Sequence, residues 1–383
     1  MLANVLRPVA LPPALMGRPA PCDFFDARGT LLLRAGMPIL PNAGGNAMQP
    51  GGRRLYCHAE QAARISPADP INALRHVGEA LSMLDELSHT PHLLGRDEFF
   101  ELTEVLHQNW RLDADACIGY VRLASFDRPS VCHALLAALL AAELASANGL
   151  PPREQLITMG AALTMNLGSL RLHDDMHARV GAPDTTTRQQ LENHPTLAAN
   201  LLERIGGFPE DWIEAVAQHH ECVDGSGYPQ GLQRVEICLG ARILRIADML
   251  AARLHGRRAR RPQYWSLQHA RDPYKLMAHV FAADLSRIDH TLARLLMVRL
   301  GSFPPGSIVR LNTGELAVVS RRTTPPGEMP AEVLAFLDAT GKPHAQPRMR
   351  KIGPRDCRIL AYAHDDLPRL PACNWAAAWG YGH

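Results

Sequence analysis

The chain has 383 residues, of which 46% are hydrophobic and 20% are charged. This composition is typical of a globular protein and excludes wholesale disorder, and the length favours two or three domains. The formal net charge of +2 at pH 7 excludes a strongly basic protein, so we expect no nucleic acid among its partners.

The cysteines and the apolar stretches bear on the compartment. The eight cysteines never form a Cys-x-x-Cys pair, so a reducing compartment without disulfides or zinc knuckles fits best. The longest apolar stretch, residues 134–147, contains Glu143 and is too short to span a bilayer. Pro12 and Pro13 interrupt the first apolar residues, which favours a flexible tail over a cleaved signal. We therefore expect a cytoplasmic protein without a membrane span.

Residues 1–69 are predicted to be an N-terminal segment with little regular structure. Residues 22–41 hold two short apolar runs around Arg28 and Gly29, a pattern that predicts a small β-hairpin. Glycine, proline and asparagine then crowd residues 41–52, which we interpret as a loop or linker.

Apolar residues recur with helical spacing from residue 70 to residue 301. In the first stretch, residues 71–89, Leu74, Val77 and Leu81 share one helix face. Residues 70–124 are therefore predicted to be N-terminal helices. Residues 125–301 continue the series and are predicted to be an all-α domain.

The periodicity changes after residue 301. Residues 308–322 are two alternating runs around Asn312-Thr313-Gly314, which predict a β-hairpin, and a further strand follows it. Residues 302–366 are thus predicted to be a small C-terminal β module. The tail, residues 367–383, contains Trp375, Trp379 and Tyr381, and the sequence leaves open whether it packs on the body or stays loose.

Several histidines and acids lie on the predicted helices or at their ends: His133, His194, His219, His220, Glu221, Asp224 and Asp248. A single histidine on an apolar helix is more often a hydrogen-bonded structural group than a ligand. The adjacent pair, His219 and His220, differs from such a single histidine. Successive helix residues point about 100° apart, so both rings can reach one metal only near a helix end, where Asp224 and the glycines place them.

The stretch HHECVDGSGYPQGL, residues 219–232, resembles the signature of the HD-GYP family. That signature reads His-His-Glu, two residues, then Asp-Gly-x-Gly-Tyr-Pro. VCHALLAALL, ENHPTLAANLL and ARILRIADML resemble other family helices in family order, so the resemblance covers roughly residues 125–300. It implies a mainly α fold: an HD-domain-like helical bundle, here with a small N-terminal β-hairpin and a small C-terminal β module. It also implies hydrolysis of cyclic di-GMP at two or three iron or manganese ions.

The sequence departs from the family at the His-Asp dyad that names it. Met165 stands at the histidine position, Asn166 at the aspartate position and Ser169 at the lysine position. A thioether suits copper(I) rather than iron or manganese, and a neutral amide cannot bridge two cations. Pro129 and Ala251 replace two further family acids. We therefore expect no catalytic residues, and we expect Thr164, Met165 and Ser169 to fill space at the site.

The residual metal ligands are expected to be His133, His194, His219, His220 and Asp248. We expect no cofactor, the alternative being one iron, manganese or zinc ion on His194, His219 and His220, since three histidines can hold one metal. His173 and Asp174 lie eight residues after the lost dyad, in a stretch that matches a family loop. We therefore do not expect them to take over the role of the dyad.

Two other features have a functional and a structural interpretation. The loop with Asp224, Gly225, Gly227, Tyr228 and Pro229 is predicted to contact a GGDEF (diguanylate cyclase) domain, as the resemblance implies; otherwise it is a turn that shapes the domain. Arg257 and Arg260 fall at the family's two basic positions. They are predicted to bind the phosphates of cyclic di-GMP, or else to form a solvated helix end.

The sequence therefore favours a degenerate HD-GYP protein of bacterial cyclic di-GMP signalling, without hydrolytic activity, that acts through protein–protein interaction or ligand binding. Two alternatives remain open. One is a weak metal-dependent phosphodiesterase or other phosphohydrolase with a mononuclear site. The other is a structural scaffold.

Overall fold

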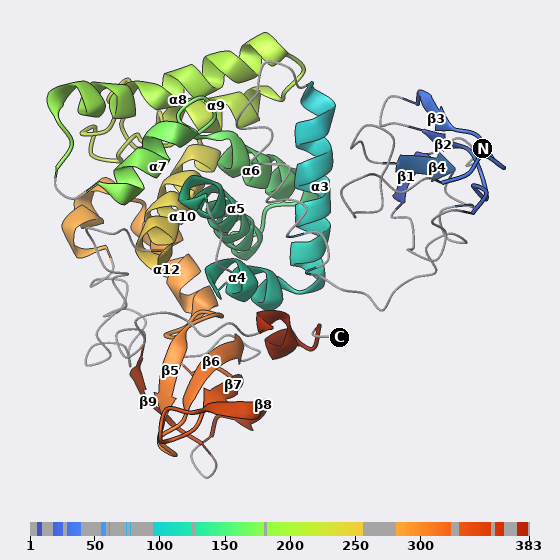
Figure 1. The fold of residues 1–383 in the computed structure, drawn as a ribbon. Coiled ribbons are helices and arrows are strands. Elements are labelled where there is room, and N and C mark those ends of the chain that lie inside the picture. Colours follow the sequence, from blue (N-terminus) through green and yellow to red (C-terminus); the bar gives the residue numbers. More distant parts are fainter. Residues whose placement is uncertain are drawn as a thin grey trace. The chain divides into compact units, whose positions relative to one another are not determined.

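The computed structural model (Figure 1) describes part of the chain in two compact units, Met1–Asn72 and Ala73–His383. The described residues are 6–9, 18–25, 29–39, 55–58, 61, 74, 77, 95–123, 128–179, 182–255, 281–322, 329–353, 357–363 and 374–381. Most of the helix predicted over 71–89 lies outside them.

The N-terminal unit is a four-stranded antiparallel sheet in the order β1-β4-β2-β3. Its strands are β1 (Leu6–Val9), β2 (Phe24–Phe25), β3 (Leu31–Leu33) and β4 (Leu55–His58). The pairing of β2 with β3 confirms the predicted hairpin. The partner strand β4 lies beyond the Gly-rich stretch and was not predicted. A small core under the sheet contains Ala20, Cys22, Phe24, Ile39, Leu55 and Cys57.

The second unit is mainly helical, as predicted. Its helices are α3 (Arg96–Leu112), α4 (Ala114–Leu123), α5 (Pro129–Ala147), α6 (Pro152–Thr164), α7 (Leu170–Ala178), α8 (Thr185–Ile205), α9 (Glu210–Gln218), α10 (Leu239–His255) and α12 (His290–Leu300), with a 3-10 helix η4 (Ala282–Arg287). In Figure 1 the other helices surround α5.

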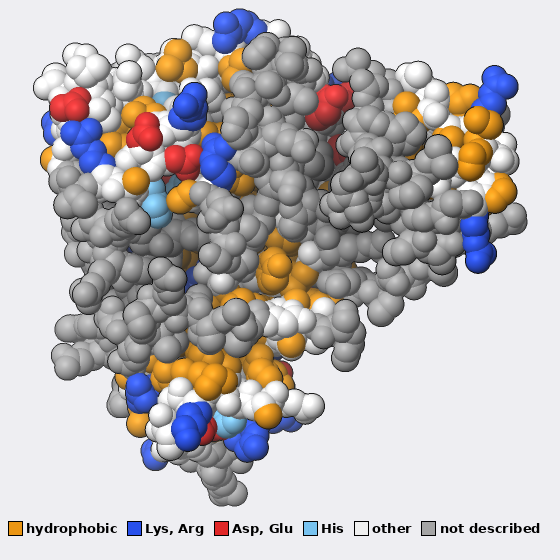
Figure 2. All heavy atoms as spheres, in the orientation of Figure 1, with side chains coloured by type: hydrophobic (Ala, Val, Ile, Leu, Met, Phe, Trp, Pro, Cys, Tyr) orange, Lys and Arg blue, Asp and Glu red, His pale blue; other side chains and the backbone are white. Residues whose placement is uncertain are grey.

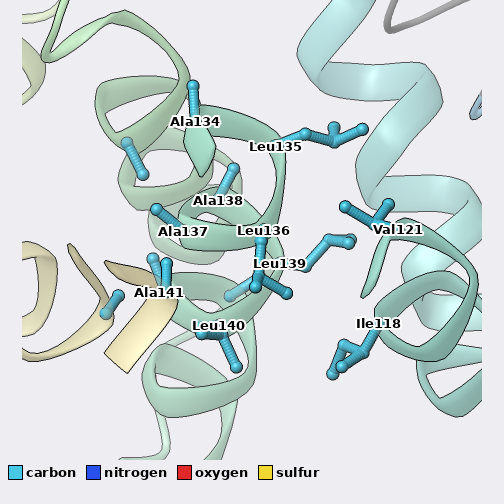
Figure 3. Close-up of a cluster of buried hydrophobic side chains, with 14 of the residues drawn as sticks. Ile118, Val121, Ala134, Leu135, Leu136, Ala137, Ala138, Leu139, Leu140 and Ala141 are labelled. Atoms are coloured by element: carbon cyan, nitrogen blue, oxygen red, sulfur yellow. The ribbon is translucent and has the colours of Figure 1, made fainter. Parts of the chain in front are cut away.

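α5 is the centre of the helical core. Pro129 begins it at a position where the missing N–H costs nothing. It is the helix, among the described residues, that is long and apolar enough to cross a membrane, but 83% of its apolar window is buried inside the domain. Leu135, Leu136 and Leu139 lie near Ile118 and Val121 of α4 in Figure 3. Its apolar length is therefore explained by core packing.

The C-terminal β module is a five-stranded antiparallel sheet in the order β8-β7-β6-β5-β9. The strands are β5 (Ile308–Leu311), β6 (Leu316–Arg321), β7 (Glu332–Leu337), β8 (Pro343–Lys351) and β9 (Ile359–Tyr362). The predicted turn between β5 and β6 contains Gly314 with φ +84°, a conformation that suits glycine.

The tail packs on the body through a 3-10 helix, η6 (Trp375–Trp379). Trp379 is 5% exposed, and its indole N–H donates to the Ser320 carbonyl at 2.7 Å. Tyr381 donates from its hydroxyl to Asp113 at 2.9 Å. Of the two possibilities that the sequence left open, the packed one is present.

A buried ionic network joins the β module to the helices. Glu143, in the middle of α5, is fully buried. It accepts hydrogen bonds from Trp110 Nε1 at 3.1 Å, Arg299 Nε at 2.6 Å and Arg322 Nη1 at 3.0 Å. Arg321 binds Asp113 through both terminal nitrogens. These paired charges explain why a carboxylate is tolerated inside an apolar helix.

Described acidic and basic side chains are interspersed on the face drawn in Figure 2, in keeping with the small net charge.

Candidate metal centre

Residues from four helices, from the turn after α6 and from the loop after α9 converge on one cavity of about 200 Å³. It lies between the start of α5, the end of α6, α7, α8 and α10, and the loop after α9. Its walls are histidine-rich and are formed by Pro129, Ser130, His133, Asn166, His173, Met176, His177, Leu191, His194, His220, Tyr228, Asp248 and Ala252. Four of the five residues predicted as residual ligands line this cavity. The fifth, His219, does not line it, but its Nε2 lies 3.1 Å from His194 Nε2.

His194, His219 and His220 form a cluster that could hold a metal ion. One nitrogen of each ring lies within 4.8 Å of one nitrogen of the other two. His194 is on α8, whereas His219 and His220 follow the last turn of α9. The helix end lets adjacent residues turn towards one point, so the placement predicted from the sequence is present.

The backbone fixes the tautomers of two of these rings. His194 Nδ1 donates to the Leu191 carbonyl at 2.5 Å, and His219 Nδ1 donates to the Val216 carbonyl at 2.7 Å. A carbonyl can only accept, so both protons are on Nδ1. The two Nε2 atoms then face each other with lone pairs at 3.1 Å.

That arrangement suits a metal ion. Burial lowers the pKa of His219 to about 3 and lowers the pKa of His194 below its ordinary value, so both rings are neutral at pH 7 and share no proton. Two facing lone pairs repel unless a cation lies on them. Metal–nitrogen bonds of about 2.0–2.1 Å would let both atoms reach one ion. The pair therefore fits one divalent metal.

His220 has a different environment. Its Nδ1 accepts a hydrogen bond from Arg245 Nη1 of α10 at 2.9 Å. Tyr228 stacks on the ring at 4.7 Å between centroids, with an interplanar angle of 20°. Burial, together with the neighbouring His219, lowers the pKa of His220 well below its ordinary value. Arg245 was not predicted as a site residue, since it lies among apolar residues of an ordinary helix.

The remaining two predicted ligands, His133 and Asp248, contact each other. His133 Nε2 lies 2.8 Å from Asp248 Oδ1. Burial alone would raise the pKa of Asp248, but the hydrogen bond that His133 donates lowers the pKa well below its ordinary value. Asp248 is thus an ionised carboxylate paired with His133, and it is the one carboxylate among the cavity-lining residues.

Residues 115–280 match the protein family described as HD domain. They include every element of the site from α5 to α10. Several curated cyclic dinucleotide phosphodiesterases are also similar to this chain. Cyclic di-GMP phosphodiesterase PA4108 of Pseudomonas aeruginosa is 26% identical over 205 residues, which are 54% of this chain and 47% of that protein. Residues 115–280 therefore resemble an HD domain of the HD-GYP type.

Two further relatives of this HD domain share shorter stretches. The response regulator RpfG of Xanthomonas campestris, a cyclic di-GMP phosphodiesterase, is 33% identical over 113 residues, 28% of this chain and 29% of that protein. The 3′3′-cGAMP-specific phosphodiesterase 1 of Vibrio cholerae is 31% identical over 120 residues, 31% of this chain and 28% of that protein. The chain thus spans about half the length of the Pseudomonas protein and less than a third of the other two.

One solved structure, Bd1817, an HDG"Y"P protein from Bdellovibrio bacteriovorus, has a TM-score of 0.48 at 15% identity, over 76% of this chain and 98% of that chain.

The positions of the HD dyad lie at the end of α6. Met165 is fully buried in the hydrophobic core and is absent from the cavity wall. Asn166 does line the cavity. The Ser169 hydroxyl donates to the Asn166 carbonyl at 2.9 Å and Thr164 accepts from Trp212 Nε1 at 2.8 Å. None of Thr164, Met165 and Ser169 lines the cavity, and all three are buried. That they fill space at the site stays a prediction.

The stretch 170–178 is a helix, α7, rather than the expected loop. His173 and His177, one turn apart, both line the cavity, and the His173 ring lies 5.1 Å from the His194 ring. Asp174 instead binds Arg128 Nε at 2.8 Å and the Ser130 N–H at 2.9 Å. The HD domain therefore gains imidazoles from α7 but no bridging carboxylate. The i, i+4 spacing of the two histidines was the signal that could have revealed them.

The signature loop is built by hydrogen bonds within it. Glu221 accepts the backbone N–H groups of Gln230 at 2.7 Å and Leu232 at 2.9 Å. Gly225 has φ +80°, and a Cβ at Gly227 would lie 2.3 Å from the Cys222 nitrogen, so both glycines are required by the turn.

The loop divides into an inner and an outer part. Asp224 accepts from both the N–H and the hydroxyl of Ser226, at 3.0 and 2.6 Å. Asp224, Ser226 and Pro229 are exposed, whereas Tyr228 is half-buried and faces the cavity. Tyr228 therefore belongs to the site of the HD domain rather than to its outer surface. Arg257 and Arg260, predicted to bind ligand, lie outside the described residues.

Proposed function

We propose that this HD-GYP-type protein takes part in cyclic dinucleotide signalling without appreciable hydrolysis, and that its site binds at most one metal ion. One observation supports this most strongly: among the described residues, the only unengaged imidazole lone pairs that converge are those of His194 and His219. The single cavity carboxylate, Asp248, is already paired with His133.

Two-metal phosphodiester hydrolysis places the cations about 3.5–4 Å apart, and their mutual repulsion requires a bridging anion. Asn166 lies at the bridging position and is neutral. A single ion on His194 and His219 can still polarise a phosphoryl oxygen. The residues of this chain therefore support binding of a phosphate group better than its cleavage.

The size of the cavity is consistent with that proposal. About 200 Å³ is below the roughly 300–1,000 Å³ of pockets that enclose drug-sized ligands. The described walls admit a phosphoryl group rather than a whole cyclic dinucleotide. Binding of cyclic di-GMP, proposed through Arg257 and Arg260, is expected to be micromolar or weaker. Isothermal titration against the variant R257A/R260A measures it; tight binding that ignores both arginines would contradict this assignment.

Metal content and turnover test the main proposal together. Protein purified without added metal should contain no more than one equivalent of iron, manganese or zinc by elemental analysis. It should show no turnover of cyclic di-GMP with manganese or iron(II). Turnover that His219→Ala abolishes, with two or more metal equivalents, would refute the proposal.

The second candidate is a weak mononuclear phosphodiesterase, favoured by the clustering of three histidines within 4.8 Å. Three histidines with an open fourth position are a known catalytic arrangement. Slow turnover with one metal equivalent, lost in both His194→Ala and His219→Ala, would select this candidate over the first.

The partner is proposed to be a GGDEF domain that contacts the exposed side of the signature loop. Gln230 is exposed at its end, so Gln230→Arg should weaken a pull-down of a diguanylate cyclase. Gln190→Arg, an equally exposed glutamine on α8, is the matched control. Equal capture by both variants would count against this surface.

A further inference from the structure

Arg245 makes His220 chemically different from the other two histidines of the cluster. Its Nη1 lies 2.9 Å from His220 Nδ1. A guanidinium stays protonated and has no acceptor, so His220 Nδ1 must accept. The one proton of the neutral ring is then on Nε2. His194 and His219 have the opposite tautomer, because their Nδ1 atoms donate to carbonyls.

The fold holds His220 in that state from two sides. Arg245 Nη2 also lies 3.8 Å from Cys222 Sγ, in the turn that follows the histidine pair. Tyr228 stacks on one face of the ring. Arg245 is absent from the cavity-lining residues, whereas His220 is one of them.

We infer that Arg245 fixes His220 as an N–H donor towards the cavity and withholds it from a metal ion. The metal is then held by His194 and His219 alone, and His220 Nε2–H is available to a phosphoryl oxygen or another small anion. The chemical reason is that an imidazole offers a metal a lone pair, and here the guanidinium occupies one nitrogen and the proton the other. This inference deepens the proposed function at the same site.

Histidine-selective ¹⁵N labelling of the metal-free full chain tests the tautomer directly. Long-range ¹H–¹⁵N spectra should show His220 as the Nε2–H form and His194 and His219 as Nδ1–H forms. The His220 signals are assigned by their disappearance in His220→Asn. Arg245→Met should convert His220 to a mixture of tautomers. Arg242→Met is the matched control, because Arg242 is on the same helix and binds Asp289 at 2.9 Å instead. A wild-type Nδ1–H form for His220, or no change in Arg245→Met, would overturn the inference.

Zinc affinity provides the second measurement. Arg245→Met frees a third imidazole lone pair, so zinc should bind about tenfold more tightly or better, the size of effect that partners of metal ligands exert. Arg242→Met removes the same charge from the same helix and should leave the affinity within about twofold. Equal gains in both variants would show a general charge effect and refute the specific one. If Arg245→Met does not fold, Arg245→Lys replaces it, since lysine lacks the planar fork.

Inorganic phosphate is the probe for the donor role. Its addition to the zinc-loaded wild-type protein should shift the His220 Nε2 signal, and the same addition to Arg245→Met should shift it less. An unchanged signal at saturating phosphate would overturn the anion-donor part. None of these measurements depends on turnover, so a hydrolytic wild-type protein would refute the proposed function while leaving the tautomer assignment intact.

Discussion

Gly160 of α6 is the point where a single methyl group should disturb both the core and the histidine cluster. A Cβ at this position would lie 1.9 Å from Cη2 of Trp212, far inside any real contact. Trp212 is fully buried on α9, seven residues before His219. Gly160→Ala therefore pushes α9 away from α6, and with it the histidine pair away from His194.

The magnitude follows from three opposing effects. Alanine gains about 1 kcal/mol over glycine in a helix interior. Overpacking costs about 1–3 kcal/mol, and loss of the Trp212–Thr164 hydrogen bond, 2.8 Å long, costs about 0.5–1.5 kcal/mol. The free energy of unfolding should thus fall by about 2 kcal/mol, and zinc affinity should fall with it.

A double-mutant cycle in chemical denaturation measures this coupling. In the Trp212→Leu background the clash is gone, so Gly160→Ala should be neutral or stabilising by up to about 1 kcal/mol through helix propensity. The reasoning is refuted if Gly160→Ala costs the same in both backgrounds, or if it stabilises the otherwise wild-type protein.

Three further outcomes are expected. His219→Ala removes one of the two converging lone pairs, so zinc content by elemental analysis should fall to background while the circular dichroism spectrum persists. Burial alone would raise the pKa of Glu143, but Arg322 lowers it below the ordinary value of 4.5; its stabilising effect is complete above pH 4.5 and is lost as pH falls through the lowered pKa. Glu143→Gln should cost about 3–5 kcal/mol at pH 7 and remove that acid dependence from denaturation curves. Gly119→Ala places a Cβ 2.1 Å from Trp379, so limited proteolysis should release the C-terminal tail faster than in the wild-type chain.

Much of the fold was predictable because its patterns are local. The helical spacing in the described stretches between residues 95 and 301, the break after them and the Asn312–Gly314 turn each specify their own element, and these elements are present. The N-terminal sheet was only half predicted. β2 and β3 are close in sequence, whereas β4 pairs with β2 across the long Gly-rich stretch, and no local pattern specifies such a pairing.

The site was predicted as a set of residues but not as a set of chemical states. The family resemblance identified His194, His219 and His220, and the structure brings them together. The sequence could not show that Arg245 engages His220, because that contact depends on how α10 packs against the turn after α9. Nor could it show that α7 is a helix that directs His173 and His177 to the cavity.

If the site binds at most one metal ion, as proposed, the residues at the dyad positions explain how the fold persists. Met165 contributes a fully buried apolar side chain to the core, where a histidine would bury a polar ring and lose packing contacts. Asn166 keeps the size of an aspartate at the cavity wall without a charge that would need a cation. Arg245 places a fixed positive charge beside His220. With Asp248 as the one carboxylate among the cavity-lining residues, and that carboxylate paired with His133, the helices around the cavity have no carboxylate cluster for a metal to neutralise. The two facing lone pairs of His194 and His219 are the feature that still favours an ion.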